Sequence, residues 1–445
     1  MVSESTVTPA PALRRELGRW DLTAIGVNQV IGGAVFALPA ALALHAGSWS
    51  PWMVAAVGVS SMLIALSFAE VSSRFEGTGG PYLYTRAAFG RFLAFEVGWM
   101  MWFTRAASWA SVITVLVSSV GFYWPAVTTG VWRSVLISSI IVLLAAINIR
   151  GIKQSSFVVN LLTAGKLIPL AIFIAIGMFY IDWGRVAAPA ALTTTQLSTS
   201  ALLLIFAFGG YEVVPVLGGE AKDPRRAIPF ALIMTIVIVT AIMTLAQLVA
   251  LGTLPGLASP EITTPLADAA ALFIGPLGAV MITLGAVMST SGNNMGQALS
   301  GSRNLYALAE QGDLPRVFGY VHPKFRTPSN AILTTAGVSL MLALSGSFAT
   351  LAAASAISRL LVYVATCASM IRLRAARFGG QVNPPRFTVP GGPIVPSLAI
   401  LIALAILFGA TRQQLISGAY ALAAGAVLYL IALRGRNGAV ASEGR

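Results

Sequence analysis

Cysteine, histidine and charged side chains are scarce in this chain of 445 residues. The single cysteine, Cys367, excludes an internal disulfide and offers no metal-ligand spacing. The two histidines, His45 and His322, fall near expected loops, so we predict no metal site, no cofactor and no catalytic residues. Only 10% of the residues are charged, whereas an ordinary soluble domain has about a quarter. The composition therefore argues against a soluble domain and against an enzyme.

Long hydrophobic runs stand in place of charge, and 57% of the residues are hydrophobic. Runs of this length predict membrane-spanning helices. We therefore expect an all-α polytopic membrane protein with twelve transmembrane helices, surrounded by a lipid bilayer. The expected segments lie near residues 20–46, 51–73, 92–124, 131–149, 158–180, 199–218, 228–252, 275–300, 329–346, 348–371, 394–411 and 415–433.

A single transmembrane domain, residues 20–434, is expected between an N-terminal tail (1–19) and a C-terminal tail (435–445). The first eighteen residues are polar, so we expect no cleavable signal peptide. Cytoplasmic loops are enriched in lysine and arginine, and placing both termini in the cytoplasm puts 22 of the 28 basic residues inside. The net charge of +13 then follows from topology in a plasma or inner membrane, and we expect no nucleic acid partner. The other six basic residues are Arg133, Arg185 and Arg412, expected outside, and Lys166, Arg105 and Arg359, expected within the membrane.

Two glycine pairs interrupt segments that should otherwise form continuous helices. Gly32-Gly33 lies in the first segment and Gly209-Gly210 in the sixth, and Pro39 and Pro215 follow them. Glycine costs a helix interior roughly 1 kcal/mol, and proline removes a backbone donor. Paired breaks in two halves indicate a transporter's binding site, with close helix packing through small residues as the alternative. Because the two segments cross in opposite directions, we predict two inverted repeats, about 20–180 and 199–372, followed by two helices at about 394–434.

Helix ends at such breaks can bind a zwitterion with backbone groups alone. Amides that begin the second half of a broken helix suit a carboxylate, and carbonyls that end the first half suit an ammonium. Phe206, Phe208 and Trp109 are candidates for an aromatic wall, with ordinary packing as the alternative reading. The predicted substrate-binding residues are Ile31, Gly32, Gly33, Ala34, Val35, Phe206, Ala207, Phe208, Gly209, Gly210 and Trp109.

Ionisable residues inside a membrane are costly and usually functional. Lys166 lies within the fifth segment, and Glu212 directly follows the second break. A buried lysine can act as a proton-sensitive charge. We predict a role in coupling or gating for both, with a structural ion pair as the alternative. For Arg105 and Arg359 the structural alternative is at least as good.

Several motifs, taken in their order along most of the chain, resemble the amino acid–polyamine–organocation (APC) superfamily of secondary transporters. Residues 32–36 resemble that family's Gly-Ser-Gly-Ile/Val-Phe stretch in the first helix, and residues 206–212 are similar to its sixth-helix motif. Further similar stretches are residues 79–84, 148–153, 219–229, 265–269, 300–309 and 322–328.

This resemblance implies a leucine-transporter-like fold of five plus five inverted helices that works by alternating access. It implies that the substrate carboxylate rests on the first helix and the amino group on carbonyls of helices 1 and 6. Lys166 matches a lysine that in relatives occupies the place of a sodium ion between helices 1, 5 and 8. Sodium-independent transport, by proton symport or exchange, is therefore implied. Ser289 and Asn294 of helix 8 would contribute to the same region.

Two departures from the motif bear on the substrate. Gly33 and Ala34 replace its serine and last glycine, so a side-chain hydroxyl for the carboxylate is lost, and Phe206 stands where some exchangers of basic amino acids carry tryptophan. Since Glu212 is the only nearby acid, we predict neutral L-amino acids as substrates, protons as candidate partners and no obligate protein partner. A cationic amino acid or polyamine exchanger of the same fold is the alternative. A membrane amino acid sensor without net transport is the alternative of another class.

Overall fold

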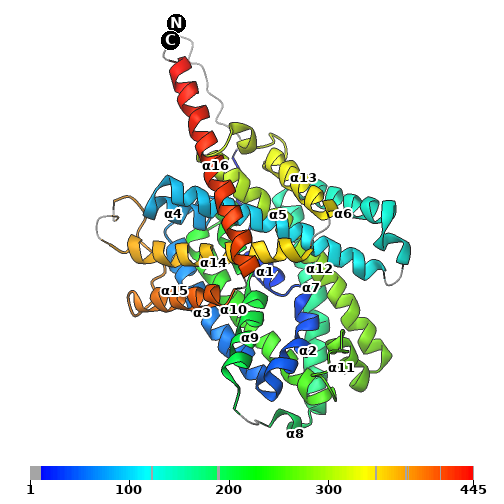
Figure 1. Ribbon diagram of the computed structural model, residues 1–445. Coiled ribbons are helices and arrows are strands. Elements are labelled where there is room, and N and C mark those ends of the chain that lie inside the picture. Colours follow the sequence, from blue (N-terminus) through cyan, green and yellow to red (C-terminus); the bar gives the residue numbers. More distant parts are fainter. Residues whose placement is uncertain are drawn as a thin grey trace.

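The computed structural model (Figure 1) describes residues 12–121, 124–187, 191–345, 348–375, 378, 380–410 and 412–443. Within these ranges the chain is mostly helical and forms no β-strand beyond an isolated bridge between Leu17 and Ala221, which confirms the all-α prediction for this part. The α-helices are α1 (Arg19–Val30), α2 (Ala34–Ala46), α3 (Ser50–Ser72), α4 (Pro81–Phe89), α5 (Arg91–Gly121), α6 (Gly130–Arg150), α7 (Ile152–Gly177), α8 (Trp183–Val186), α9 (Thr194–Phe208), α10 (Pro224–Thr253), α11 (Pro265–Phe273), α12 (Pro276–Glu310), α13 (Ser329–Ser345), α14 (Phe348–Leu373), α15 (Ile394–Phe408) and α16 (Arg412–Glu443). The 3-10 helices are η1 (Gly47–Trp49), η2 (Pro125–Thr128), η3 (Met178–Tyr180), η4 (Tyr211–Glu220) and η5 (Arg316–Gly319).

Seven helical stretches of the described chain are long and apolar enough to cross a membrane. Others of the twelve expected segments fall short for separate reasons. The helices α13 and α15 are apolar but short, and α1 stops after 12 residues. The helix α12 buries a run of polar side chains inside the protein, where they do not meet lipid. The seven stretches are Val35–Ser72, Arg91–Val117, Gly130–Arg150, Ile152–Tyr180, Thr194–Glu220, Pro224–Thr253 and Leu415–Leu433.

Both long segments that carry glycine pairs are interrupted at those glycines. The helix α1 ends at Val30 and α2 begins at Ala34, with Gly33 as its N-cap. The second interruption separates α9, which ends at Phe208, from η4. Gly210 lies between them with φ of +134°, a conformation that glycine adopts without steric cost.

The broken helix α1 packs against α7, α10 and α12. Glycines on α12 allow the close approach, since a side chain on Gly292 would overlap Asn28 and one on Gly296 would overlap Gln29. The Asn28 side chain donates to the Gly292 carbonyl at 2.7 Å, and the Gln29 side chain donates to the Asn293 carbonyl at 3.2 Å. Small residues therefore bring the break of the first segment against the middle of α12, as in other membrane helix pairs.

Several helices differ from the sequence-based boundaries. The helix α12 continues to Glu310, beyond the expected end near residue 300, and its final turns are polar yet buried, with Arg303 fully inaccessible. The hydropathy of the sequence falls at these polar turns although the helix continues, which is why the predicted end was too early. The short helices α4 and α11 lie where connections were expected. The helix α16 runs to Glu443, into the range expected to be a tail.

Candidate functional site

The two interruptions lie against each other. A Cβ atom on Gly210 would lie 2.6 Å from the Gln29 carbonyl oxygen and 3.0 Å from the Val30 amide nitrogen. A side chain at residue 210 is therefore excluded both by its positive φ and by the end of α1. Ends of two segments far apart in the sequence thus form one junction inside the protein.

A cavity of about 140 Å³ opens at this junction. Pockets for drug-sized ligands measure about 300–1,000 Å³, so this cavity suits a smaller solute. Its wall mixes glycine backbone, hydroxyl and amide side chains, one aromatic ring and a single charged side chain. The lining residues are Gln29, Val30, Gly32 and Gly33 around the first break, Ser108, Ser111 and Val112 of α5, Phe206, Ala207 and Gly209 around the second break, Asn293 and Gln297 of α12, and Arg359 of α14.

Backbone groups of opposite polarity meet at the junction. The N-cap of α2 is Gly33, which supplies no side chain to cap the first amides of the helix. The last carbonyls of α1 and α9 lie at the same place, and helix ends carry roughly half a unit charge of each sign. Some of these carbonyls already accept one bond, as Val30 does from the Gly32 amide at 2.8 Å and Phe206 from the Gly209 amide at 3.2 Å. A carbonyl oxygen has two lone pairs, so the junction can still receive an ammonium as well as a carboxylate.

Lys166 is fully buried behind the first break. Its ammonium donates to the carbonyls of Ile31 at 2.7 Å, Asn28 at 3.1 Å and Ser289 at 3.3 Å. The Ser289 hydroxyl donates to the same Ile31 carbonyl at 2.9 Å. Lys166 therefore links the C-terminal end of α1 to α7 and α12 through carbonyl oxygens, and among the described residues no carboxylate is paired with it.

Glu212 lies directly behind the second break with two arginines beside it. It forms an ion pair with Arg105 of α5, and its Oε1 lies 3.0 Å from Nε of Arg359 without hydrogen-bond alignment. Its other oxygen accepts from the Gly210 amide at 2.8 Å and from the Tyr363 hydroxyl at 2.9 Å. The carboxylate thus fixes the backbone of the break to α5 and α14, and two guanidinium groups share it.

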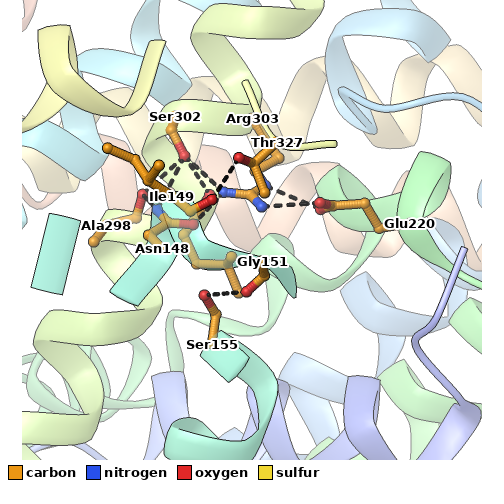
Figure 2. Close-up of polar contacts among 10 residues, drawn as sticks. Asn148, Ile149, Gly151, Ser155, Glu220, Ala298, Ser302, Arg303 and Thr327 are labelled. Atoms are coloured by element: carbon orange, nitrogen blue, oxygen red, sulfur yellow. Dashed lines mark hydrogen bonds and ion pairs between the residues drawn. The ribbon is translucent and has the colours of Figure 1, made fainter. Parts of the chain in front are cut away.

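A second buried network lies where the end of α6, the end of η4 and the late turns of α12 meet (Figure 2). Arg303 binds both oxygens of Glu220, at 2.8 and 2.9 Å, and donates to the Asn148 side chain at 2.5 Å. Both partners of the ion pair are inaccessible. Asn148 also donates to the Ala298 carbonyl at 3.1 Å. We call Asn148, Glu220, Ser302 and Arg303 the Arg303 network, and it ties the segment after the second break to α12.

The segment of residues 12–18 packs over this region as a strap. The backbone amides of Glu16 and Leu17 donate to the Glu220 carbonyl at 3.0 Å, and the Lys222 amide donates back to Leu17 at 3.0 Å. The Leu17 side chain is almost completely buried. Another strap contact is made by Arg326, which donates to the Ala12 carbonyl at 2.8 Å. We call the side of the protein formed by the strap and the Arg303 network the N-terminal face.

The predicted binding residues divide between the cavity and its surroundings. Five of them line the cavity, namely Gly32, Gly33, Phe206, Ala207 and Gly209. Among the described residues, the following do not line it: Ile31, Val35, Phe208, Gly210 and Trp109. The side chain of Ala34 lies outside the described part of the chain. Trp109 is fully buried, one position away from the lining residue Ser108.

The predicted coupling residues are likewise only partly brought together. Lys166 and Ser289 meet at the Ile31 carbonyl, whereas the Asn294 side chain bonds to the Thr290 carbonyl of its own helix at 2.9 Å. Glu212 joins a different cluster. The α5 and α12 side chains of the cavity were not among the residues predicted from the sequence. Their signal was helical spacing, since residues 108, 111 and 112 share one face of α5, and residues 293 and 297 share one face of α12.

Comparisons with known proteins agree over nearly the whole chain. The family model described as amino acid permease matches residues 17–432. The serine/threonine exchanger SteT of Bacillus subtilis is 28% identical over 405 residues, covering 87% of this chain and 89% of that protein. The branched-chain amino acid permease BcaP of the same organism is 26% identical over 441 residues, covering 94% and 93%. A methylthioribose transporter of that organism is 26% identical over 443 residues, covering 96% and 95%. The relatives are transporters, but their named substrates differ.

Proposed function

The chain belongs to the amino acid permease family and is a multi-pass membrane protein, and from this premise we propose that it is a secondary active transporter of small α-amino acids. The observation that carries the proposal is the cavity at the junction of the two breaks. A transporter site formed by broken helices from two halves is the arrangement expected for alternating access.

Backbone groups would recognise the part that all α-amino acids share. Amides at the start of α2 would receive the carboxylate, and those of Val35 and Phe36 would then turn from the carbonyls of Gly32 and Gly33, to which they donate at 3.3 and 3.2 Å. Carbonyls at the ends of α1 and α9 would receive the ammonium. The polar side chains of Ser108, Ser111 and Asn293 would complete the hydrogen bonds. The modest cavity volume supports a small amino acid as the substrate.

Lys166 supports sodium-independent transport. Its ammonium already occupies the space between the carbonyls of Asn28, Ile31 and Ser289. A monovalent cation at this position would meet both its positive charge and its volume. Coupling is then left to protons or to exchange of one amino acid for another.

Helix contacts support two inverted repeats, and α15 and α16 would add two crossings to make twelve. If α1/α2 is counted as helix 1 and α9/η4 as helix 6, the repeats relate α3, α5, α6 and α7 to α10, α12, α13 and α14. The packing of α5 on α14 then corresponds to that of α12 on α7, and the packing of α1 on α10 to that of α9 on α3. Matching contact pairs of this kind are expected from a pseudo-two-fold axis.

The N-terminal face is the proposed cytoplasmic gate of a plasma or inner membrane transporter. The strap and the Arg303 network close it, and inward opening would have to separate η4 from α12 at the Glu220–Arg303 pair. The charge distribution in the sequence, with most basic residues on the side of the termini, supports the cytoplasmic assignment.

The alternative of a cationic amino acid or polyamine exchanger meets an obstacle at Arg359. This is the only charged side chain that lines the cavity among the described residues, and it carries the same sign as such a substrate. Neutral amino acids, predicted from the sequence, meet no such repulsion, and neither do acidic ones. A sensor would have the same binding site, so only a measurement of substrate flux distinguishes it from a transporter.

Uptake into proteoliposomes tests the proposal. Labelled L-amino acids and polyamines would be offered with choline, sodium or an inward proton gradient outside. We expect uptake of at least one amino acid above the level of protein-free vesicles, unchanged when choline replaces sodium. Binding without uptake, under both gradient and preloading conditions, would indicate the sensor, and absence of binding across all amino acids would refute the proposal.

A further inference from the structure

Arg359 holds an unusual place for a buried arginine. Its side chain is 11% exposed and lines the cavity, while its Nε faces Glu212. Its terminal nitrogen Nη1 lies over the backbone of Gly209, since a Cβ atom there would overlap Nη1 and lie 3.0 Å from Cδ. The guanidinium also lies 5.9 Å from the centre of the Phe206 ring. Within the described chain, Nη1 and Nη2 of Arg359 make no hydrogen bond, so their donors remain for a ligand.

The charges around the cavity do not balance. Arg105 and Arg359 share one carboxylate, Glu212, so this buried cluster carries one net positive charge. Glu212 is already saturated, since it also accepts from the Gly210 amide and the Tyr363 hydroxyl. An uncompensated charge inside a membrane protein is costly and usually pairs with a substrate or an ion. An anion within the cavity would satisfy both the charge and the donors of Arg359.

The α-carboxylate of the substrate has its own hydrogen-bond donors, the amides that start α2. A neutral amino acid placed there would leave Arg359 without a counter-charge. We propose that Arg359 selects substrates with a second carboxylate, so that the substrates of this protein are monoamino dicarboxylic acids of the aspartate and glutamate type. The side-chain carboxylate pairs with the Arg359 guanidinium, opposite the helix end that holds the α-carboxylate. This inference rests on the proposed transport function and names its substrate class.

The surroundings of the cavity favour a substrate with a second carboxylate over one with a second cationic group. The Phe206 ring, 5.9 Å from the guanidinium, lines the same cavity, and a planar guanidinium can bind a carboxylate through two parallel hydrogen bonds. Lysine or a polyamine would place a second cation beside an already positive cluster. Glutamine and asparagine differ from the acids by one neutral amide and thus isolate the contribution of charge.

The experiment measures binding of L-glutamate, L-aspartate, L-glutamine, L-asparagine and L-lysine to purified protein, and their uptake into proteoliposomes. The wild type is compared with Arg359→Gln and Arg359→Lys. Removal of Arg359 leaves Glu212 paired with Arg105 in a one-to-one ion pair, so Arg359→Gln is expected to fold. Arg372→Gln is the matched control, because Arg372 is also on α14 and also lies over an aromatic ring, 5.0 Å from Phe89, but does not line the cavity.

We expect the wild type to bind an acid more tightly than its amide. Arg359→Gln should lose about 100-fold in affinity for the acid, the loss typical of a buried charge deprived of its partner, while the amide should bind as well as before or better. Arg359→Lys should recover part of the acid affinity, and Arg372→Gln should match the wild type. Binding of amides as tight as that of acids to the wild type would overturn the inference and leave the proposed function intact. An equal loss of acids and amides in Arg359→Gln would assign Arg359 to the α-carboxylate and overturn it as well. Failure of all amino acids to bind the wild type would instead remove the proposed function.

Discussion

Replacement of Lys166 by methionine removes a buried cation while keeping much of its volume. The ammonium donates to three carbonyls, of Asn28, Ile31 and Ser289, and lies at the negative end of α1. A buried polar group left without its partner costs about 1–3 kcal/mol. Against this loss stands the desolvation cost of the ammonium itself, which the substitution relieves. In the variant the Ser289 hydroxyl still donates to the Ile31 carbonyl, and the Ser289 carbonyl, in the middle of α12, keeps its intrahelical donor. The Asn28 carbonyl therefore loses its donor, and we expect a net loss of about 1–3 kcal/mol.

The assay is thermal denaturation of purified protein in detergent, read by a maleimide dye or by loss of the monodisperse peak. Lys153→Met is the matched control, because Lys153 lies on the same helix with an exposed side chain. We expect Lys166→Met to unfold several degrees lower and the control to stay unchanged. A variant as stable as the wild type would mean that the carbonyl contacts do not offset the cost of burying the ammonium, and would refute this account of Lys166.

A smaller side chain at the same position gives a second test of Lys166. Lys166→Ala leaves a space bordered by three carbonyl oxygens and the Ser289 hydroxyl, a set of ligands that suits a hard cation. Sodium at 100 times its dissociation constant would then stabilise the variant by about 2.7 kcal/mol. We expect sodium, compared with choline, to raise the denaturation temperature of Lys166→Ala and to leave the wild type unchanged. Equal responses of both proteins would contradict the proposed basis of sodium independence.

Three further substitutions test other contacts. Gly210→Ala should abolish uptake and lower stability by about 1–3 kcal/mol, because alanine is strained at positive φ and would overlap the end of α1. The control is Gly337→Ala, in open space on α13. Full uptake by Gly210→Ala would count against a binding site at the junction of the two breaks. Glu220→Gln leaves the inaccessible Arg303 without its carboxylate and should lower stability, measured by thermal denaturation, by about 3–5 kcal/mol. Adding Arg303→Met should recover part of the lost stability. If Glu220→Gln alone loses no stability, the Glu220–Arg303 pair does not hold the proposed gate closed. Ser289→Ala should lower stability by only about 1 kcal/mol, since Lys166 still donates to the Ile31 carbonyl. A loss of stability equal to that of Lys166→Met would contradict the larger role given to Lys166.

The sequence predicted the two breaks well because their cause is local. Glycine pairs in the middle of apolar segments weaken a helix wherever the segment is placed, and the structure interrupts both segments there. The contact between Gly210 and the end of α1 could not be predicted, since it depends on how segments far apart in the sequence pack. The same limit applies to the end of α12, where polar residues such as Arg303 stay helical because Glu220 and Asn148 satisfy them.

Individual site residues were harder to predict for the same reason. Phe206 and Gly209 line the cavity, whereas Trp109 is buried one step away, and only the rotation of α5 about its axis decides between Trp109 and Ser108. The role of Arg359 depends on a charge count across α5, η4 and α14, which no single stretch of sequence contains. Neutral amino acids were predicted from the sequence because Glu212 is the only nearby acid. That two arginines share Glu212, and leave a net positive charge, depends on the fold and could not be predicted.

The central claim is that backbone ends at the two breaks bind both charged groups of an α-amino acid. Competition against a transported amino acid, with analogues that lack either group, tests it most directly. The claim predicts that the methyl ester, which lacks the α-carboxylate, and the des-amino acid, which lacks the ammonium, both fail to compete, in the wild type and in Arg359→Gln alike. Competition by either analogue as strong as that of the intact amino acid would contradict it.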